Sequence, residues 1–178
     1  METIRWTRME SPVGELVLAA SERGLAALEF ERRKSAPAIA DGSWFRGAEW
    51  KEDAAPLQET MRQLREYFAG TRREFTVPLD LHGPEFHMKC WRALLGIPYG
   101  ETRSYAEIAR KVGSPEGFRA VGQANHHNPV AIIVPCHRVL NSNGGLSGYG
   151  GGLETKRFLL KLEGARCEGG GAPTLFDE

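Results

Sequence analysis

The sequence predicts an α+β protein: a small N-terminal β-meander-plus-helix domain followed by a mostly helical C-terminal domain. Short apolar runs separated by turn residues fill the first part of the chain, and apolar residues at helical spacing fill residues 85–165. Gly83 and Pro84 favour a turn between the two patterns. We therefore expect domains over residues 1–80 and 85–165, and a flexible tail over residues 166–178.

The first domain contains two short apolar runs, ELVLAA and LAALEF, separated by the turn-forming stretch 21–24. They predict a β-meander that starts near Ile4. Residues 35–55 mix polar residues with proline and glycine, so we expect a surface loop there. After Pro56, apolar residues recur at helical spacing until Gly70, which predicts one helix. The next segment, EFTVPLDL, is typical of a returning strand.

The second domain carries three helix signals in succession. An apolar stripe over residues 86–95 predicts the first helix. Ser104 followed by Glu107 is a capping box for the next helix, which Gly113 ends. The pair Ser114–Pro115 predicts the start of a third helix that carries EGFRAVGQAN. Two short helices joined by a glycine turn outline a helix-turn-helix, although the same spacing is common in plain helical bundles.

The remainder of the second domain surrounds a cysteine. Val130–Val134 is a β-branched run that predicts a short strand ended by Pro135. Cys136 follows directly. A glycine-rich loop, NSNGGLSGYGGG, comes next, and a last helix is expected over Glu154–Glu163, closing at Gly164.

Composition indicates a globular protein, with 41% hydrophobic and 26% charged residues. The 23 basic and 23 acidic residues are unevenly spread: residues 85–165 hold ten against six, a net charge of +4, and residues 1–84 hold twelve against fourteen. The net positive charge of residues 85–165 has the sign expected of a nucleic-acid-binding module. The N-terminus has no apolar signal region, and no apolar run is long enough to span a membrane. We expect an intracellular, cytoplasmic protein, or a nuclear one in a eukaryote.

The three cysteines suggest different roles. They cannot form a disulfide framework, and none has metal-ligand spacing, so we expect no metal site. Cys90 lies on an apolar stripe beside Trp91 and is expected in the core, and Cys167 lies in a glycine-rich segment without an assigned function. Cys136 is either a buried small hydrophobe or a nucleophile whose thiolate is favoured by adjacent imidazole and guanidinium groups.

His137 is the natural partner to consider for Cys136. Neighbouring residues on a strand point to opposite faces, so a direct Cys–His hydrogen bond requires the backbone to turn, or a water to bridge the two groups. From the residues alone, a structural role for His137 is favoured over a catalytic one. A carboxylate behind the imidazole would favour catalysis, and Glu163 is the candidate.

The block NPVAIIVPCHRVL, followed by GYGGGLETKRFLLKLEG, closely resembles the O6-alkylguanine-DNA alkyltransferases, also called methylated-DNA–protein-cysteine methyltransferases. SYAEIA and RAVGQANHHNP fit the same family. The resemblance covers residues 86–165 strongly and the first domain more loosely, where it implies a ribonuclease-H-like fold. Pro-Cys-His-Arg with Asn-Pro seven residues before the Pro–Cys pair is a specific signal.

The resemblance implies DNA repair by a suicide enzyme. An alkyl (methyl) group would move directly and irreversibly from O6-alkylguanine in double-stranded DNA to Cys136, once per molecule and without a cofactor. His137 would take the thiol proton through a water, Glu163 would orient His137, and Asn128 would tie the preceding turn to the helix-turn-helix. We expect a monomer.

The same resemblance implies a minor-groove helix-turn-helix that flips the base. Arg119 would fill the gap left by the base, which offsets part of an extrusion cost of about a few kcal/mol. Tyr105 matches the tyrosine that bonds the base N3, and its hydroxyl and loop amides aimed at N3 and O6 would stabilise the departing guanine. The implied DNA contacts are Arg119, Phe118, Tyr105, Ser104, Gln123 and Asn125. The implied base pocket comprises Tyr105, Val139, Tyr149, Gly150 and Cys136.

The chain departs from the family pattern in several places. Phe118 replaces the usual alanine before the arginine; we expect it to pack inward, with an apolar wedge in the DNA as the alternative. Gly150 stands where several relatives have serine. His126 and His127 are expected as solvated loop residues, with phosphate contact as the alternative. The first domain has no cysteine, so we expect no zinc site there.

The tail APTLFDE resembles peptides that dock on sliding clamps but lacks their leading glutamine, so packing or fraying of Leu175 and Phe176 is favoured.

A lesion-binding protein without catalysis is the first alternative function, and the presence of Cys136 argues against it. A cysteine hydrolase is the second, and the Asn-Pro and Gly-Tyr-Gly context fits it poorly. The alkyl size range and activity on O4-alkylthymine stay open.

Overall fold

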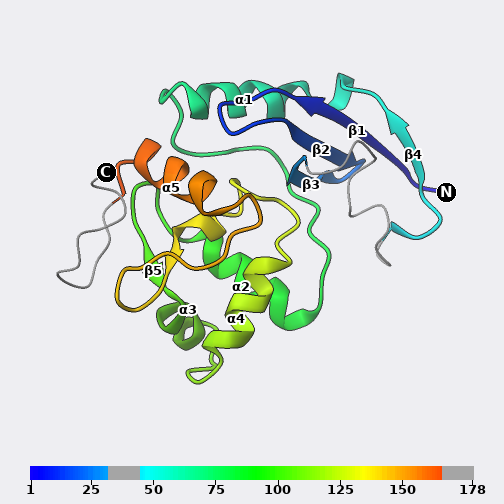
Figure 1. Ribbon diagram of the computed structural model, residues 1–178. Helices are drawn as coiled ribbons and strands as arrows, with labels where there is room; N and C mark the ends of the chain where they lie inside the picture. Colours follow the sequence, from blue (N-terminus) through cyan, green and yellow to red (C-terminus); the bar gives the residue numbers. More distant parts are fainter. Residues whose placement is uncertain (32–44, 166–178) are drawn as a thin grey trace. The chain divides into compact units, whose positions relative to one another are not determined.

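The computed structural model describes residues 1–31 and 45–165, and it divides into two compact units. Among these residues, the first unit comprises those within Met1–Gly83 together with Pro129–Ala131, and the second comprises Pro84–Asn128 and residues 132–165. Strands dominate the first unit and helices the second (Figure 1). The predicted α+β class is therefore confirmed.

The first unit is built on a four-stranded sheet in the order β3-β2-β1-β4. The strands β1 (Thr3–Met9), β2 (Leu16–Ser21) and β3 (Gly24–Phe30) form the predicted antiparallel meander. The fourth strand, β4 (Glu49–Glu52), pairs parallel with β1. The loop expected over residues 35–55 is wrong for these four residues, and residues 35–44 lie outside the described part of the chain. The residues of β4 lie at the sheet edge with mostly exposed side chains, so no apolar pattern marks the strand.

One helix follows the sheet. The short 3₁₀ helix η3 (Ala55–Leu57) leads into α1 (Gln58–Phe68), and Gly70 with φ 78° follows the end of α1, as the spacing predicted. The strand expected in EFTVPLDL is absent from the described residues, where only a single bridge joins Leu79 to Leu25. Pro78 within that segment has no N–H to donate to a ladder, so pairing there stays short.

The second unit packs three helices together: α2 (Glu85–Leu95), α3 (Tyr105–Lys111) and α4 (Phe118–His126). A two-residue strand before α3, β5 (Arg103–Ser104), pairs parallel with β6 (Val139–Leu140). The 3₁₀ helix η4 (Cys136–Arg138) comes just before β6, and α5 (Leu153–Leu162) follows the glycine-rich loop. The core of this unit includes Trp91, whose indole N–H donates to the Ala124 carbonyl at 2.8 Å.

The predicted helix-turn-helix outline is present as α3, a turn and α4. The Ser104–Glu107 capping box is confirmed, and Gly113 adopts φ 81° after α3. The expected start of the next helix at Ser114–Pro115 is wrong, because α4 begins at Phe118 without a side-chain cap. Ser114 instead accepts a backbone hydrogen bond from Gly117 at 2.8 Å, which makes a turn.

The strand predicted over Val130–Val134 is also wrong. Only Val130 forms a bridge, to Leu28, and the next residues form turns in which Ile132 has φ 71°. Asn128 Nδ2 donates to the Val134 carbonyl at 2.8 Å, and Cys136 N donates to the same carbonyl at 2.8 Å. These bonds hold the segment in a tight turn, although its composition is typical of a buried strand.

Candidate active site

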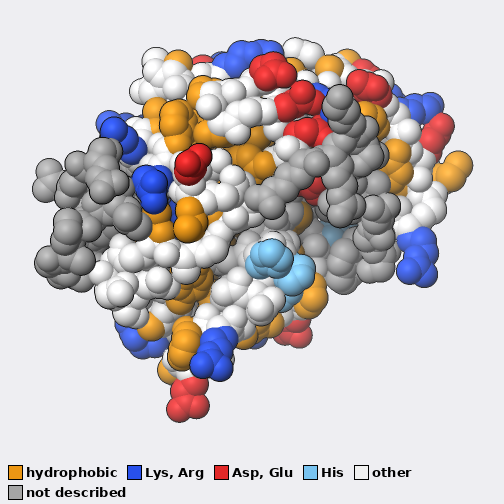
Figure 2. Space-filling model, viewed as in Figure 1, with side chains coloured by type: hydrophobic (Ala, Val, Ile, Leu, Met, Phe, Trp, Pro, Cys, Tyr) orange, Lys and Arg blue, Asp and Glu red, His pale blue; other side chains and the backbone are white. Residues whose placement is uncertain are grey.

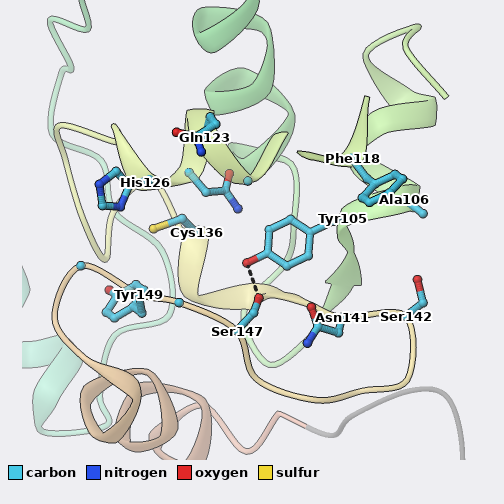
Figure 3. Close-up of a pocket in the computed structure, with 14 residues that line it drawn as sticks. Tyr105, Ala106, Phe118, Gln123, His126, Cys136, Asn141, Ser142, Ser147 and Tyr149 are labelled. Atoms are coloured by element: carbon cyan, nitrogen blue, oxygen red, sulfur yellow. Dashed lines mark hydrogen bonds between the residues drawn. The ribbon is translucent and has the colours of Figure 1, made fainter. Parts of the chain in front are cut away.

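A pocket of about 840 Å³ lies within the second unit, and Cys136 opens into it. Its walls come from α3, α4, the turn at Cys136 and the glycine-rich loop. Figure 3 shows Cys136 between the rings of Tyr105 and Tyr149. The lining residues are Tyr105, Ala106, Phe118, Gly122, Gln123, Asn125, His126, Cys136, Asn141, Ser142, Ser147, Gly148, Tyr149 and Gly150.

Cys136 begins the 3₁₀ helix η4 and is only 7% exposed. The backbone therefore turns at the cysteine, which removes the expectation that its neighbour must point to the opposite face. Burial raises the pKa of the Cys136 thiol, and the Asn128 side chain and the Lys156 charge act to lower it. The resting sulfur is thus held as a thiol that needs a base.

His137 provides a base whose proton position is fixed. Its Nε2 lies 2.7 Å from Oε2 of Glu163, and both side chains are completely buried. A carboxylate only accepts, so Nε2 carries the proton and Nδ1 keeps its lone pair. Nδ1 is buried and has no hydrogen-bond partner among the residues that the structure describes. It is therefore available to receive a proton.

Arg138 supplies the charge that keeps Glu163 ionised. Its Nε donates to Oε1 of Glu163 at 2.7 Å and its Nη2 to Oε2 at 3.1 Å, while Nη1 donates to the Ile97 carbonyl at 2.7 Å. Burial raises the pKa of Glu163, but His137 and Arg138 outweigh it and hold that pKa well below 4.5. Burial lowers the pKa of His137, so the ring is neutral.

Lys156 belongs to this site and was missed by the sequence analysis. It is fully buried on α5, and its Nζ donates to the carbonyls of Val139 at 2.7 Å and Ser147 at 3.1 Å. Burial lowers its pKa to about 8. The signal was present in the sequence, because Lys156 shares the apolar face of α5 with Leu159 and Leu160 at helical spacing.

Tyr105 and the glycine-rich loop face each other across the pocket. The Tyr105 hydroxyl accepts a hydrogen bond from Ser147 Oγ at 3.0 Å (Figure 3). Burial raises the pKa of Tyr105, so the phenol stays protonated. Tyr149 places its ring edge-on to His137 with centroids 6.5 Å apart, and Gly150 adds open backbone to the wall. The pocket wall thus carries two tyrosine side chains and a serine hydroxyl in addition to Cys136.

The start of α4 carries the two residues expected to enter DNA. Arg119 is exposed, and its guanidinium lies 6.0 Å from the centre of the Phe118 ring. Phe118 is 48% exposed, so the expectation that it packs inward is wrong. It is the first residue of α4, one turn before Val121, where the buried face begins. Gln123 lines the pocket, whereas the Ser104 hydroxyl accepts from Glu107 N in the α3 cap.

Histidines gather at the end of α4. His126 is the last residue of α4, so it is helical rather than a loop residue, whereas His127 follows as the C-cap in a turn; both side chains are exposed. Their rings meet edge-on at 5.2 Å, and His127 stacks on His87 at 5.5 Å. Figure 2 shows histidine side chains on the surface where Figure 1 draws α4. His126 also lines the pocket.

The remaining expectations concern the other two cysteines, the tail, metal sites and membrane-spanning helices. Cys90 is fully buried, as predicted. Cys167 and the clamp-like tail lie outside the described residues. Within residues 1–31 and 45–165, no group of three or more histidine, cysteine or acidic residues is arranged to hold a metal ion. Across the same residues, no helix has the length and apolar character needed to cross a membrane.

Two family models match the chain. The model for the DNA binding domain of 6-O-methylguanine DNA methyltransferase matches residues 85–165, and the model for its ribonuclease-like domain matches residues 4–81. Together they cover both units.

Curated relatives match over nearly their full length. The methylated-DNA–protein-cysteine methyltransferase of Methanosarcina acetivorans is 49% identical over 156 residues, which are 88% of this chain and 96% of that protein. The protein of the same name from Mycobacterium bovis is 46% identical over 177 residues, 98% of this chain and 99% of that protein.

Solved structures agree. The crystal structure of the Mycobacterium tuberculosis O6-methylguanine methyltransferase is 46% identical, covers 92% of this chain and 93% of its own, and superposes with a TM-score of 0.79. A structure of the M. tuberculosis protein in complex with DNA is 45% identical, covers 90% and 92%, and has a TM-score of 0.78. The chain therefore belongs to the methylated-DNA–protein-cysteine methyltransferase family, as its Pro-Cys-His-Arg block predicted.

Proposed function

We propose that this protein repairs DNA by moving an alkyl group from O6 of guanine to the sulfur of its own Cys136. The observation that carries the proposal is the buried sequence of groups behind the pocket. A thiol with a raised pKa stands beside His137. The Glu163 carboxylate fixes the proton on Nε2 of that histidine, and its Nδ1 has no hydrogen-bond partner among the described residues. This arrangement suits a nucleophile that is activated at the moment of reaction.

The chemical step balances as a displacement. The Cys136 thiol gives its proton, through a water, to Nδ1 of His137, and the sulfur attacks the alkyl carbon. The sulfur–carbon bond forms as the carbon–O6 bond breaks, and guanine leaves as an anion that takes up one proton. Tyr105, held as a neutral phenol, is the donor beside the base. The product thioether is stable, so each molecule acts once.

Access to the buried O6 atom requires the nucleotide to leave the stack. We propose that α3 and α4 bind the minor groove and that Arg119 and Phe118, both exposed at the start of α4, occupy the gap. The base would then enter the pocket between Tyr105 and Tyr149. An M. tuberculosis relative solved with DNA, 45% identical, supports DNA as the partner.

Partners and location follow from the same reaction. One copy of the chain carries every residue used above, so we propose that it acts as a monomer. A DNA substrate and a reduced thiol place the reaction inside the cell. Sliding-clamp docking rests on the tail alone and stays an expectation.

The test is the intact mass of the protein after incubation with a duplex that holds one O6-methylguanine. We expect one methyl group per molecule, absent from Cys136→Ala and absent with an undamaged duplex. Cys136→Ala should still bind the damaged duplex. Repeated turnover, or methylation that survives in Cys136→Ala, would contradict the proposal.

A further inference from the structure

His126 has a distinct position in the pocket, and the reaction above assigns it no role. Of the residues that line the pocket, all within the described part of the chain, only His126 can carry a positive charge, and none is acidic. The other titratable side chains in the lining are Cys136, Tyr105 and Tyr149, which are neutral when protonated. His126 is also exposed at the end of α4 (Figure 3). It therefore lies at the rim of the pocket.

A row of aromatic rings supports His126 from the interior of the second unit. The rings of His126 and His127 meet edge-on with their centroids 5.2 Å apart, and His127 stacks on His87 at 5.5 Å. The buried Trp91 comes next in the row, 5.8 Å from His87. Nδ1 of His127 donates to the Gln123 carbonyl at 2.8 Å, since a carbonyl only accepts. The row therefore joins α2 to the end of α4 and holds the imidazole at the rim.

No carboxylate neutralises this row within the described part of the chain. Among those residues, only the other two histidines of the protein contact a carboxylate. The charged residues near His87 on α2 are Glu85 and Lys89, which lie 4.0 Å from each other. Burial and the charge of His127 lower the pKa of His87, which favours its neutral form. A proton taken up by the row is therefore expected on its exposed end.

We propose that protonated His126 binds a phosphate that flanks the extruded nucleotide, so that DNA binding strengthens as the pH falls. This inference rests on the proposed function. An extruded nucleotide stays joined to its strand through a phosphate on each side, so these phosphates pass over the rim of the pocket that takes the base. A cation at the rim can donate a charge-assisted hydrogen bond to one of them. Imidazole gains its charge between about pH 8 and pH 5, which makes the contact depend on protons.

The experiment measures the affinity of Cys136→Ala, which lacks the acceptor sulfur, for a duplex that holds one O6-methylguanine. Fluorescence anisotropy at several salt concentrations gives the affinity at pH 6 and at pH 8. Adding His126→Gln should weaken binding about tenfold at pH 6 and by less than about twofold at pH 8. At pH 6 the slope of log affinity against log salt concentration should also shrink by about 0.9, because one phosphate contact is lost.

Two further variants separate the charge of His126 from its surroundings. His126→Arg keeps a positive charge at both pH values, so it should bind at pH 8 about as tightly as its parent binds at pH 6. His127→Phe is the matched control, because it keeps a ring in the row and removes the neighbouring titratable group. It should retain the pH response of the parent.

Three results would overturn the inference and leave the proposed function intact. They are an equal loss at both pH values in His126→Gln, an unchanged salt slope in that variant at pH 6, and a pH response that disappears in His127→Phe. Absence of methyl transfer by the wild-type protein, together with no preference for the damaged duplex, removes the proposed function and this inference with it. Melting temperatures at both pH values show whether a general loss of binding reflects unfolding.

Discussion

Oε2 of Glu163 lies 2.7 Å from Nε2 of His137, with neither side chain exposed to solvent. The two residues are 26 positions apart, yet this single contact decides which nitrogen of the imidazole carries its proton. Since Glu163 also receives two hydrogen bonds from Arg138, its negative charge is compensated without protonating the histidine. A neutral base is thereby held beside the thiol.

Glu163→Gln should therefore be strongly destabilising. The change leaves the buried Arg138 guanidinium without a counter-charge, and removal of one partner from a buried ion pair costs about 3–5 kcal/mol. Urea unfolding at pH 7 measures the loss. Glu154→Gln, an exposed change on α5, is the control and should stay within about 0.5 kcal/mol. Equal midpoints for the two variants would contradict the role given to the pair.

The stability of the wild-type protein should fall with acid for the same reason. The folded pKa of Glu163 is held below 4.5, so its contribution is full above that value and is lost as the pH falls. The folded pKa of His137 is also lowered, below 6.5, so protonation of the unfolded chain adds a loss that begins near pH 6.5. Unfolding midpoints from pH 7 to pH 3 test this. The gap between wild type and Glu163→Gln should narrow below pH 4.5; a constant gap would contradict it.

Local patterns predicted the elements that local residues decide. The capping box at Ser104 and the turn glycines at Gly70 and Gly113 act through their own backbone, and each appears where expected. The strand expected over Val130–Val134 does not form, because contacts from outside the segment set its backbone conformation. Leu28 pairs with one end of it, and the Asn128 side chain closes the other.

In the site, too, some features could be predicted from the sequence, and others depend on the folded structure. Glu163 could be named as the partner of His137 from the sequence, because the motif fixed both positions. Two features could not be predicted, because they depend on how the glycine-rich loop and α4 fold around the pocket. They are the Lys156 bonds to the Val139 and Ser147 carbonyls, and the Asn125 amide, which has no hydrogen-bond partner among the described residues. Phe118 was predicted to pack inward because of its size. It is instead exposed, because it is the first residue of α4 and precedes the buried face of that helix.

Lys156→Met should lower the transfer rate at pH 7, because loss of the Lys156 charge raises the pKa of the Cys136 thiol and reduces the fraction of thiolate. The Lys156 charge acts to lower the pKa of Cys136, and that charge disappears as the pH rises through about 8. The ratio of wild-type to variant rate should therefore shrink between pH 7 and pH 9. Single-turnover rates measure it, with the exposed Lys161→Met as control. A ratio independent of pH would leave Lys156 a purely structural role.

Arg119→Ala should separate duplex repair from chemistry. The Arg119 guanidinium is exposed and Arg119 is not among the residues that line the pocket, so its loss should spare reaction with the free base O6-benzylguanine. Transfer from a duplex should fall about ten- to hundredfold, because the gap left by the base is no longer filled. Arg92→Ala, which removes an exposed charge on α2, should reduce neither rate to that extent. Equal losses on both substrates would remove the proposed role.

Phe118→Ala tests the residue that the sequence misplaced. Because the ring is 48% exposed, its removal should change the free energy of unfolding by less than about 0.5 kcal/mol. If the ring acts as an apolar wedge at the distorted base step, the variant should bind duplex about tenfold more weakly and still react normally with the free base.

Leu95→Ala, another exposed apolar residue at 44%, is the matched control for general loss of apolar surface, and it should leave DNA affinity unchanged. Fluorescence anisotropy with a labelled duplex measures the affinity, and urea unfolding measures the stability. A large loss of stability with unchanged affinity would mean that Phe118 supports the packing of α4. A loss of affinity at constant stability assigns the ring to the DNA, where it lies beside the Arg119 guanidinium at 6.0 Å and would enter the same gap.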